Sequence, residues 1–223
     1  MNKPAANPKD TFLNLSESKR GIIISAMVHE FALNGYRKAS MNAVVKKAGI
    51  SKGSLYQYFS SKEDIFLFVF DQFTTLVKSA VISESEKLKG TGAAFWDEVK
   101  SVLVAGVGFI DSYPVYFQLY MRVLFEHDLP QREALLTRVR LFSKEYFTPL
   151  IQLARKEGVL RSDISFEMVL FTLDAMLDRF LQGYSESYLD GSLRLTEKSG
   201  PQLNGVIDEI ITILQDGLSI QGD

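Results

Sequence analysis

Apolar residues recur every three or four positions along most of the chain, a spacing typical of amphipathic helices. The pattern predicts nine helices and no strand, so the expected fold class is all-α. Gly35 and Gly158 are expected to end helices, Gly90 and Gly92 to break the chain, and Pro149 to kink the seventh helix. The expected helices cover about 17–34, two short stretches within 40–59, then 61–87, 93–111, 115–127, 130–157, 165–189 and 202–217.

Residues 40–64 carry the most informative pattern, two short helices around a tight turn and the start of a third. Ser40 suits the N-cap of the first helix, because its hydroxyl can accept from a free backbone N–H of the first turn. Gly49 supplies the left-handed residue that ends this helix, and Ser51 caps the next one. This is the layout of a helix-turn-helix, whose second helix lies in the DNA major groove.

The second short helix, residues 52–58, divides its polarity between two faces. Leu55 and Phe59 are four apart and can face inward together. Gly53 is costly inside a helix, so a close approach of the backbone to another surface is a plausible reason for it. An ordinary helical hairpin with a tyrosine-rich surface is the alternative interpretation. The polar side chains left for base edges and phosphates are Lys52, Ser54, Tyr56, Gln57 and Tyr58.

Two motifs in the N-terminal part of the chain resemble those of a known family. It is similar over residues 17–66 to the N-terminal domain of tetracycline-repressor-type (TetR family) regulators. The motifs that carry the resemblance are Phe31-Ala32-x-x-Gly35-Tyr36 and Ala48-Gly49-Ile50-Ser51-Lys52-Gly53-Ser54-Leu55-Tyr56-x-Tyr58-Phe59-x-Ser61-Lys62-Glu63. Glu30 departs from the family pattern, because many relatives carry an apolar residue there.

The resemblance implies a division of labour among the DNA-binding residues. Those expected to approach bases are Lys52, Gly53, Ser54 and Gln57. Those expected mostly to hold the DNA backbone are Ser40, Asn42, Tyr56, Tyr58 and Lys62.

The charge distribution agrees with a DNA-binding N-terminal part. The whole chain of 223 residues has a formal net charge of −2. Residues 1–64 carry ten Lys and Arg against five Asp and Glu, and the remainder carries fifteen against twenty-two. A basic DNA-reading domain joined to an acidic domain would show this asymmetry, although chance clustering of surface lysines would show it too.

We expect three parts along the chain. Residues 1–10 are polar, contain two prolines and lack the apolar stretch of a signal peptide, so residues 1–15 are expected to form a flexible N-terminal arm. Residues 16–62 form the helix-turn-helix domain, and residues 63–223 form a helical ligand-binding and dimerisation domain, with the helix at 61–87 connecting the two. No run of 18 apolar residues indicates a transmembrane helix, so a cytoplasmic protein is expected.

The last two predicted helices are apolar around most of their circumference, which requires burial on more than one side. A partner subunit would provide this, and the resemblance implies a homodimer in which these helices form a four-helix bundle. A monomer with two central core helices is the alternative. The residues expected at the dimer interface are Phe180, Ile207, Ile210 and Leu214.

Catalysis is not expected. The chain has no cysteine, His29 and His127 lie in separate predicted helices, and no nucleophile or nucleotide-binding motif occurs, so neither a metal nor a cofactor is expected. Two functions remain open. One is a ligand-responsive regulator of double-stranded operator DNA, expected to be a repressor released by a small apolar or aromatic effector. The other is a constitutive DNA-binding protein whose helical domain only dimerises or recruits a partner.

Aromatic and methionine side chains in the larger domain could line an effector pocket. At helical spacing the same residues are often plain core, and both interpretations remain open. The residues expected at the pocket are Trp96, Phe117, Tyr120, Met121, Tyr146 and Phe171.

Overall fold

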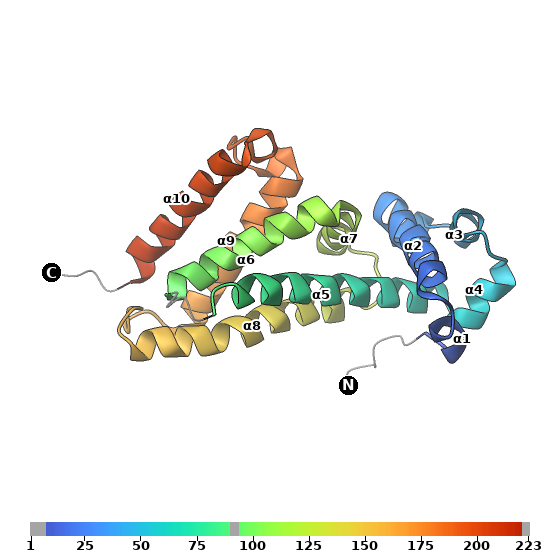
Figure 1. The fold of residues 1–223 in the computed structure, drawn as a ribbon, viewed down its shortest axis with the longest axis horizontal. Helices are drawn as coiled ribbons and strands as arrows, with labels where there is room; N and C mark the ends of the chain where they lie inside the picture. Colours follow the sequence, from blue (N-terminus) through green and yellow to red (C-terminus); the bar gives the residue numbers. More distant parts are fainter. Residues whose placement is uncertain (1–7, 90–93, 220–223) are drawn as a thin grey trace. The chain divides into compact units, whose positions relative to one another are not determined.

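The computed structural model of the chain describes residues 8–89 and 94–219 (Figure 1). Within these ranges, ten α-helices and two 3-10 helices account for the fold, and β-structure is limited to an isolated bridge between Leu160 and Ser219. The all-α prediction is confirmed. The helices are α1 Asp10–Leu13, α2 Glu17–Lys38, α3 Met41–Ala48, α4 Lys52–Tyr58, α5 Lys62–Glu86, α6 Phe95–Ser112, α7 Pro114–Phe125, α8 Arg132–Lys156, α9 Phe166–Ser185, η1 Ser187–Leu189, η2 Leu195–Glu197 and α10 Gly200–Leu218.

The nine predicted helices correspond to α2–α10. Gly35 interrupts α2 with φ +65° and ψ 173°, so the predicted break is present, although the last residues of α2 continue beyond it. Pro149 lies inside α8, and the kink expected there stays a prediction. Gly90 and Gly92 lie outside the described residues.

Helix α1 was not expected, because the sequence predicts a flexible arm over residues 1–15. That prediction is wrong for residues 10–13, where Phe12 is buried against the rings of Phe59 and Phe68. A single buried ring in a polar stretch leaves no periodic pattern to detect. The first seven residues of the expected arm lie outside the described ranges.

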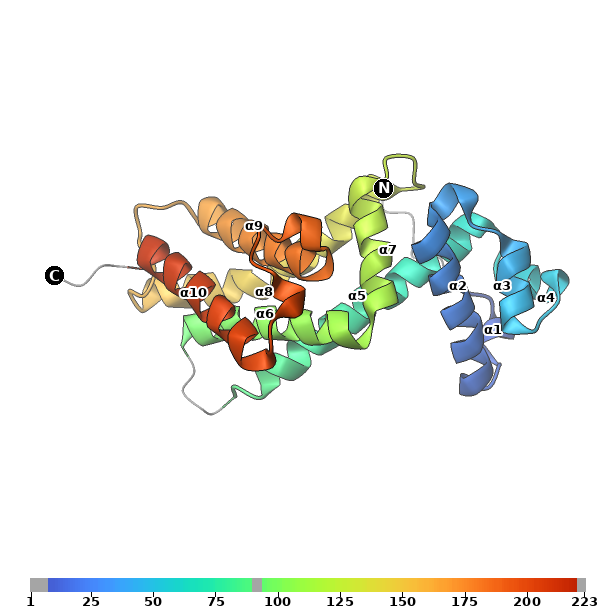
Figure 2. The ribbon, with the colours of Figure 1, turned by 90° about the horizontal axis from the view of Figure 1, so that it is seen from above.

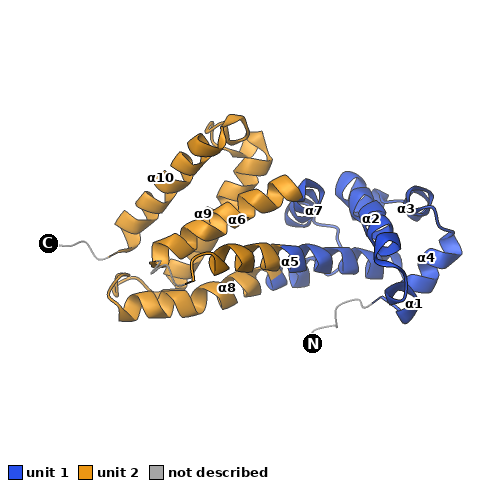
Figure 3. Ribbon diagram, viewed as in Figure 1, with its two compact units in different colours: residues 1–76, 113–138 blue, residues 77–112, 139–223 orange. Residues whose placement is uncertain are grey.

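The chain forms two compact units (Figure 3). Unit 1 contains residues 1–76 and 113–138, and unit 2 contains residues 77–112 and 139–223. The division differs from the boundary expected after residue 62, because α7 and the first half of α5 belong with the helix-turn-helix. Helices α5 and α8 each contribute residues to both units.

In unit 1, α7 is bonded to the end of α2. The Arg122 guanidinium donates from Nε to the carbonyl oxygen of Ala32 at 3.0 Å and from Nη2 to that of Leu33 at 2.8 Å. Its Nη1 donates to Oε1 of Glu126 at 2.7 Å. The positive φ of Gly35 favours glycine, and a Cβ there would lie 2.6 Å from Oε2 of Glu126, so that carboxylate would have to shift.

Helix α5 is long and apolar enough to cross a membrane by length and composition. Its apolar side chains have another explanation in unit 1, where Ile65, Phe66, Val69 and Phe70 are fully or almost fully buried. The hydropathy of α5 is thus that of a core helix.

Unit 2 has its own hydrophobic core. In Figures 1 and 2, α6 runs beside α9 and α10, and the three helices contribute Leu103, Leu173 and Ile207 to this core. Ile151 from α8 completes it, so the last two helices bury much of their apolar surface within one chain.

Candidate DNA-binding site

The helix-turn-helix is built by three local caps. Ser40 Oγ accepts from the backbone N–H of Ala43 at 3.4 Å, and Ser51 Oγ accepts from that of Ser54 at 3.0 Å. Between them Gly49 ends α3 in the left-handed conformation, with φ 64° and ψ 35°. The predicted caps and turn are confirmed, and they place α4 directly after α3.

Helix α4 presents a polar outer face. Leu55 is fully buried, while Lys52, Gly53, Tyr56 and Gln57 are exposed. Ser54 is half-buried, and its hydroxyl lies 2.8 Å from that of Ser51. The exposed face therefore presents the ammonium of Lys52, the amide of Gln57 and the phenol of Tyr56 on the outer surface of α4.

Tyr58 differs from the expectation. Only 7% of its surface is exposed, and its ring centroid lies 5.7 Å from that of Phe12. Helix α1 covers the ring, which is part of the core of unit 1, and a contact of Tyr58 with the DNA backbone stays a prediction.

Gly53 is not required by packing within the chain. Its φ is not positive, and a Cβ at this position would meet only Ser51 Oγ, at an ordinary contact distance of 3.7 Å. The described part of the chain therefore gives no packing reason for a residue of low helix propensity at this position.

Glu30 has a structural reason for its departure from the family pattern. Its Oε1 accepts from the backbone N–H of Ser40 at 2.7 Å and from Nδ2 of Asn34 at 3.0 Å. The carboxylate thus fixes the start of α3, where Ser40 and Asn42 are exposed as a backbone-contacting pair would need to be.

Lys62 is less available than expected. Its Nζ donates to the carbonyl oxygen of Arg37 at 3.2 Å and lies 5.0 Å from the ring centroid of Tyr36. Burial lowers the pKa of Lys62, and the charge of Glu30 opposes that shift. Burial also raises the pKa of Tyr36, to which the charge of Glu63 adds. Part of the role of Lys62 is therefore to fasten α5 to the end of α2.

Lys38, Lys46 and Lys47 are also exposed near the helix-turn-helix, and they were not among the residues expected to bind DNA. Arg37 is also exposed, but it pairs with Asp128 at 2.9 Å. The signal for these lysines is the excess of positive charge in residues 1–64, which does not identify individual residues.

Comparison with known proteins assigns this geometry to a family. The family described as "Bacterial regulatory proteins, tetR family" matches residues 23–69, which include α3, α4 and the start of α5. The chain belongs to the TetR family.

The relatives that match the chain are regulators, which agrees with the expectation that this protein is not an enzyme. The fatty acid metabolism regulator protein of Bacillus subtilis is 40% identical over 50 residues, 22% of this chain and 26% of its own length. The uncharacterized HTH-type transcriptional regulator YdgC of the same species is 36% identical over 83 residues, 37% of this chain and 41% of its own length. The matched segments thus span less than two thirds of these curated relatives.

A solved structure covers the TetR-family chain more fully. The crystal structure of a TetR family transcriptional regulator from Chloroflexus aurantiacus J-10-FL has a TM-score of 0.74 and 26% sequence identity. It covers 96% of this chain and 99% of its own. The likeness therefore includes both units and not only the helix-turn-helix.

The expected effector residues of the TetR-family chain are divided between the units. Phe117, Tyr120 and Met121 are buried in unit 1, whereas Trp96 and Tyr146 lie in unit 2. Phe171 is 67% exposed on α9. The expected set is therefore not a single cluster within either unit.

Two of these residues make polar contacts within unit 2. The Tyr146 hydroxyl donates to Oε2 of Glu98 at 3.0 Å, and the Ser85 hydroxyl donates to the same oxygen at 3.0 Å. Burial is the main cause that raises the pKa of Tyr146. Trp96 Nε1 donates to Oγ of Ser219 at 3.0 Å.

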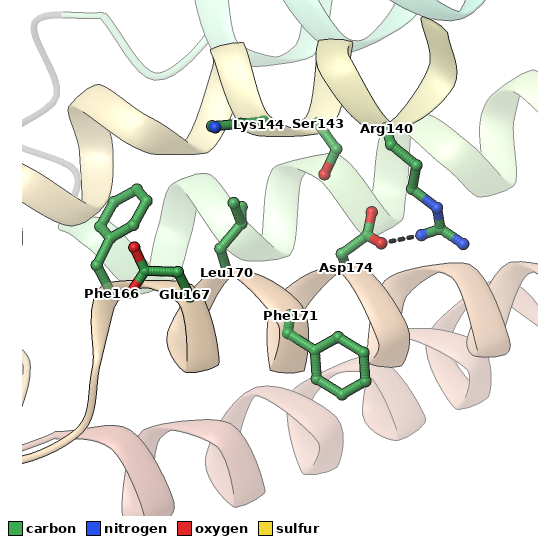
Figure 4. A pocket seen from close by; sticks show the side chains of 8 residues that line it. All are labelled: Arg140, Ser143, Lys144, Phe166, Glu167, Leu170, Phe171 and Asp174. Carbon is green, nitrogen blue, oxygen red and sulfur yellow. Dashed lines mark hydrogen bonds and ion pairs between the residues drawn. The ribbon is translucent and has the colours of Figure 1, made fainter. Parts of the chain in front are cut away.

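A groove of about 290 Å³ separates α8 from α9 on unit 2 (Figure 4). Arg140 is ion-paired across it with Asp174. The lining side chains are Arg140, Ser143, Lys144, Phe166, Glu167, Leu170, Phe171 and Asp174.

The dimer role of the four expected interface residues stays a prediction, and the structure shows where they pack within one chain. Phe180, Ile207 and Leu214 belong to the core of unit 2, and Ile210 is half-buried against it. Phe180, Ile207 and Leu214 are thus covered by packing within the chain, whereas Ile210 keeps part of its surface exposed. The apolar side chains that α9 and α10 leave exposed are Met168 at 53%, Phe171 at 67% and Ile213 at 64%.

Proposed function

We propose that the chain is a transcriptional regulator that reads double-stranded operator DNA with helix α4. The observation that carries the proposal is the exposed outer face of α4, on which Lys52, Gly53 and Gln57 stand together. The open space around Gly53 supports it, because a backbone without a Cβ can approach a groove wall closely.

The proposed roles follow from the chemistry of each side chain. An amide such as that of Gln57 can bond two edge atoms of adenine, and an ammonium such as that of Lys52 suits guanine. Ser40, Asn42 and Tyr56 would hold phosphates, which fix the register of the protein but do not specify sequence. Ser54 stays a proposed base contact, and Lys62 a partial phosphate contact.

We propose that the regulator acts as a homodimer through α9 and α10. Exposed Met168, Phe171 and Ile213 support this, because a partner subunit would remove their apolar surface from water. Two copies of α4 would then meet half-sites related by two-fold symmetry, spaced by one turn of DNA or a multiple of it.

We propose repression as the mode of action, in the cytoplasm where operator DNA lies. A dimer that occupies a promoter blocks polymerase by its volume alone. Activation would need a second surface that contacts polymerase. Repression requires only the DNA-binding face of α4, and we propose no additional surface that contacts polymerase.

We propose that a small apolar or aromatic effector binds unit 2 and lowers operator affinity. Tyr146, Ser85 and Glu98 would supply polar contacts within an otherwise apolar environment, a combination typical of ligand sites. Helix α5 contributes Ser85 to unit 2 and Lys62 to unit 1, so repacking one end can displace the other. A coupling of roughly 1–3 kcal/mol would change operator affinity about 5- to 150-fold.

Compounds that raise the melting temperature of the protein should be tested for their effect on DNA affinity. Tight ligands of unit 2 that leave operator affinity unchanged would instead favour the constitutive DNA-binding protein.

The DNA-binding proposal is tested by selecting duplexes from a random library with the full chain. We expect enrichment of a near-palindrome with two equivalent half-sites. Failure to enrich any sequence at moderate salt, with binding that depends only on salt concentration, would overturn it.

A further inference from the structure

The residues that precede α2 are bonded to the C-terminal end of α4. The backbone N–H of Lys9 donates to the carbonyl oxygen of Tyr58 at 3.0 Å, and Lys9 Nζ donates to that of Tyr56 at 3.3 Å. The Thr11 hydroxyl donates to the carbonyl oxygen of Gln57 at 2.9 Å. Residues 9 and 11 thus bond the last three carbonyl groups of α4.

These contacts complete the helix end. The last four carbonyls of an α-helix have no partner within the helix. In α4 the fourth, that of Leu55, accepts from the N–H of Phe59 at 3.0 Å. Every such carbonyl of α4 is therefore satisfied, three of them by a segment more than 40 residues earlier in the chain.

The same segment is anchored on both sides. Phe12 is 1% exposed, with its ring centroid 5.1 Å from that of Phe59 in the turn and 5.6 Å from that of Phe68 in α5. Arg20 of α2 donates to the carbonyl oxygen of Leu13 at 2.6 Å. Residues 9–13, which we call the brace, thus join α2, α4 and α5.

Helix α4 depends on such external contacts more than a longer helix would. It has seven residues, and isolated helices shorter than about 12 residues are marginal in water. Gly53 weakens it further. Its outer face carries the side chains proposed to read bases, and such contacts require a fixed orientation.

We propose that the brace is a positioning element for DNA recognition, with Thr11 and Lys9 as positioning residues that hold α4 in the orientation its operator requires. The inference rests on the proposed function. It assigns sequence discrimination to residues that need not touch DNA. A brace that only stabilised unit 1 would lower the melting temperature and leave discrimination unchanged.

The test compares Thr11→Val with Thr11→Ser in the full chain. Valine has nearly the shape of threonine but no hydroxyl, whereas serine keeps the donor. Thr11 is exposed and uncharged, so neither change should unfold the protein or alter the phosphate charge balance. The probes are the duplex selected by the wild-type chain and a scrambled duplex of equal length and composition.

For Thr11→Val we expect affinity for the selected duplex to fall about threefold to tenfold per subunit, the range for one hydrogen bond. Affinity for the scrambled duplex and the salt dependence should stay unchanged, and Thr11→Ser should restore most of the loss. Faster amide hydrogen exchange in α4 of Thr11→Val would support the same account.

Two outcomes would overturn the proposal for the brace. One is that both affinities of Thr11→Val equal those of the wild-type chain, and the other is an equal loss on both duplexes, which would make Thr11 a direct phosphate contact. Failure of the proposed function has a different signature, because the wild-type chain would then select no duplex at all.

Discussion

At the scale of single residues, Gly53 best separates the demands of folding from those of recognition. The chain leaves room for a Cβ at this position, with its nearest neighbour at 3.7 Å. Helix propensity favours alanine over glycine by about 0.8–1 kcal/mol. Folding of the chain therefore gives no reason for glycine here, and the close approach of DNA that we propose would give one.

Gly53→Ala is therefore expected to raise the free energy of unfolding by up to about 1 kcal/mol and to weaken operator binding. Urea unfolding and titration of the selected duplex measure the two effects. Gly205→Ala, at another exposed helical glycine with open space around it, controls for the general gain in helix propensity. Operator affinity equal to that of the wild-type chain would contradict the proposed close approach.

At the scale of helices, the bond between α7 and α2 is the clearest coupling within unit 1. One guanidinium satisfies two carbonyls at the end of the first part of α2, and Glu126 holds it in place. Since α2 packs on α3 in unit 1, the position of α7 bears on the helix-turn-helix.

Arg122→Met should lower the free energy of unfolding by roughly 1–2 kcal/mol, a range reduced for the partial exposure of the pair. Arg122→Lys keeps the charge but cannot make the forked contact, so it should recover only a small part of the loss. Urea unfolding of the three proteins measures this. An unchanged midpoint in Arg122→Met would show that the contact adds nothing to stability.

Periodicity and capping residues predicted nine helices and the helix-turn-helix, because Ser40, Gly49 and Ser51 act locally. They did not predict α1, whose burial depends on the distant partners of Phe12. The burial of the Tyr58 ring was missed for the same reason, because it depends on contact with the distant Phe12. Glu30 was recognised as a departure from the family pattern. Its hydrogen bond with the backbone N–H of Ser40 could not be predicted, because the pattern of side chains does not reveal a backbone partner. The roles of Lys52 and Gln57 as base contacts stay predictions.

At the scale of the whole molecule, the hydrophobicity of α9 and α10 divides into two parts. Phe180, Ile207 and Leu214 fill the core of unit 2, and an apolar pattern alone could not separate these from surface residues. Phe171 and Ile213 remain exposed and carry the homodimer proposal.

Ile213→Glu is expected to yield monomers, since it places charge on the proposed interface without disturbing the core. Leu153→Glu is the matched control, because Leu153 is similarly exposed on α8. Sedimentation velocity at micromolar concentration distinguishes the two, and specific DNA binding should fall only for Ile213→Glu. A wild-type monomer, or a dimer unaffected by Ile213→Glu, would contradict this interface.

The central claim is that α4 reads base edges, and Gln57 tests it most directly. Duplex selection is repeated with Gln57→Ala and with Gln215→Ala, an exposed glutamine on α10. We predict that Gln57→Ala relaxes or changes the preferred base at one position in each half-site, while Gln215→Ala selects the wild-type sequence. A Gln57→Ala protein that selects the wild-type sequence with undiminished preference at every position would contradict the claim.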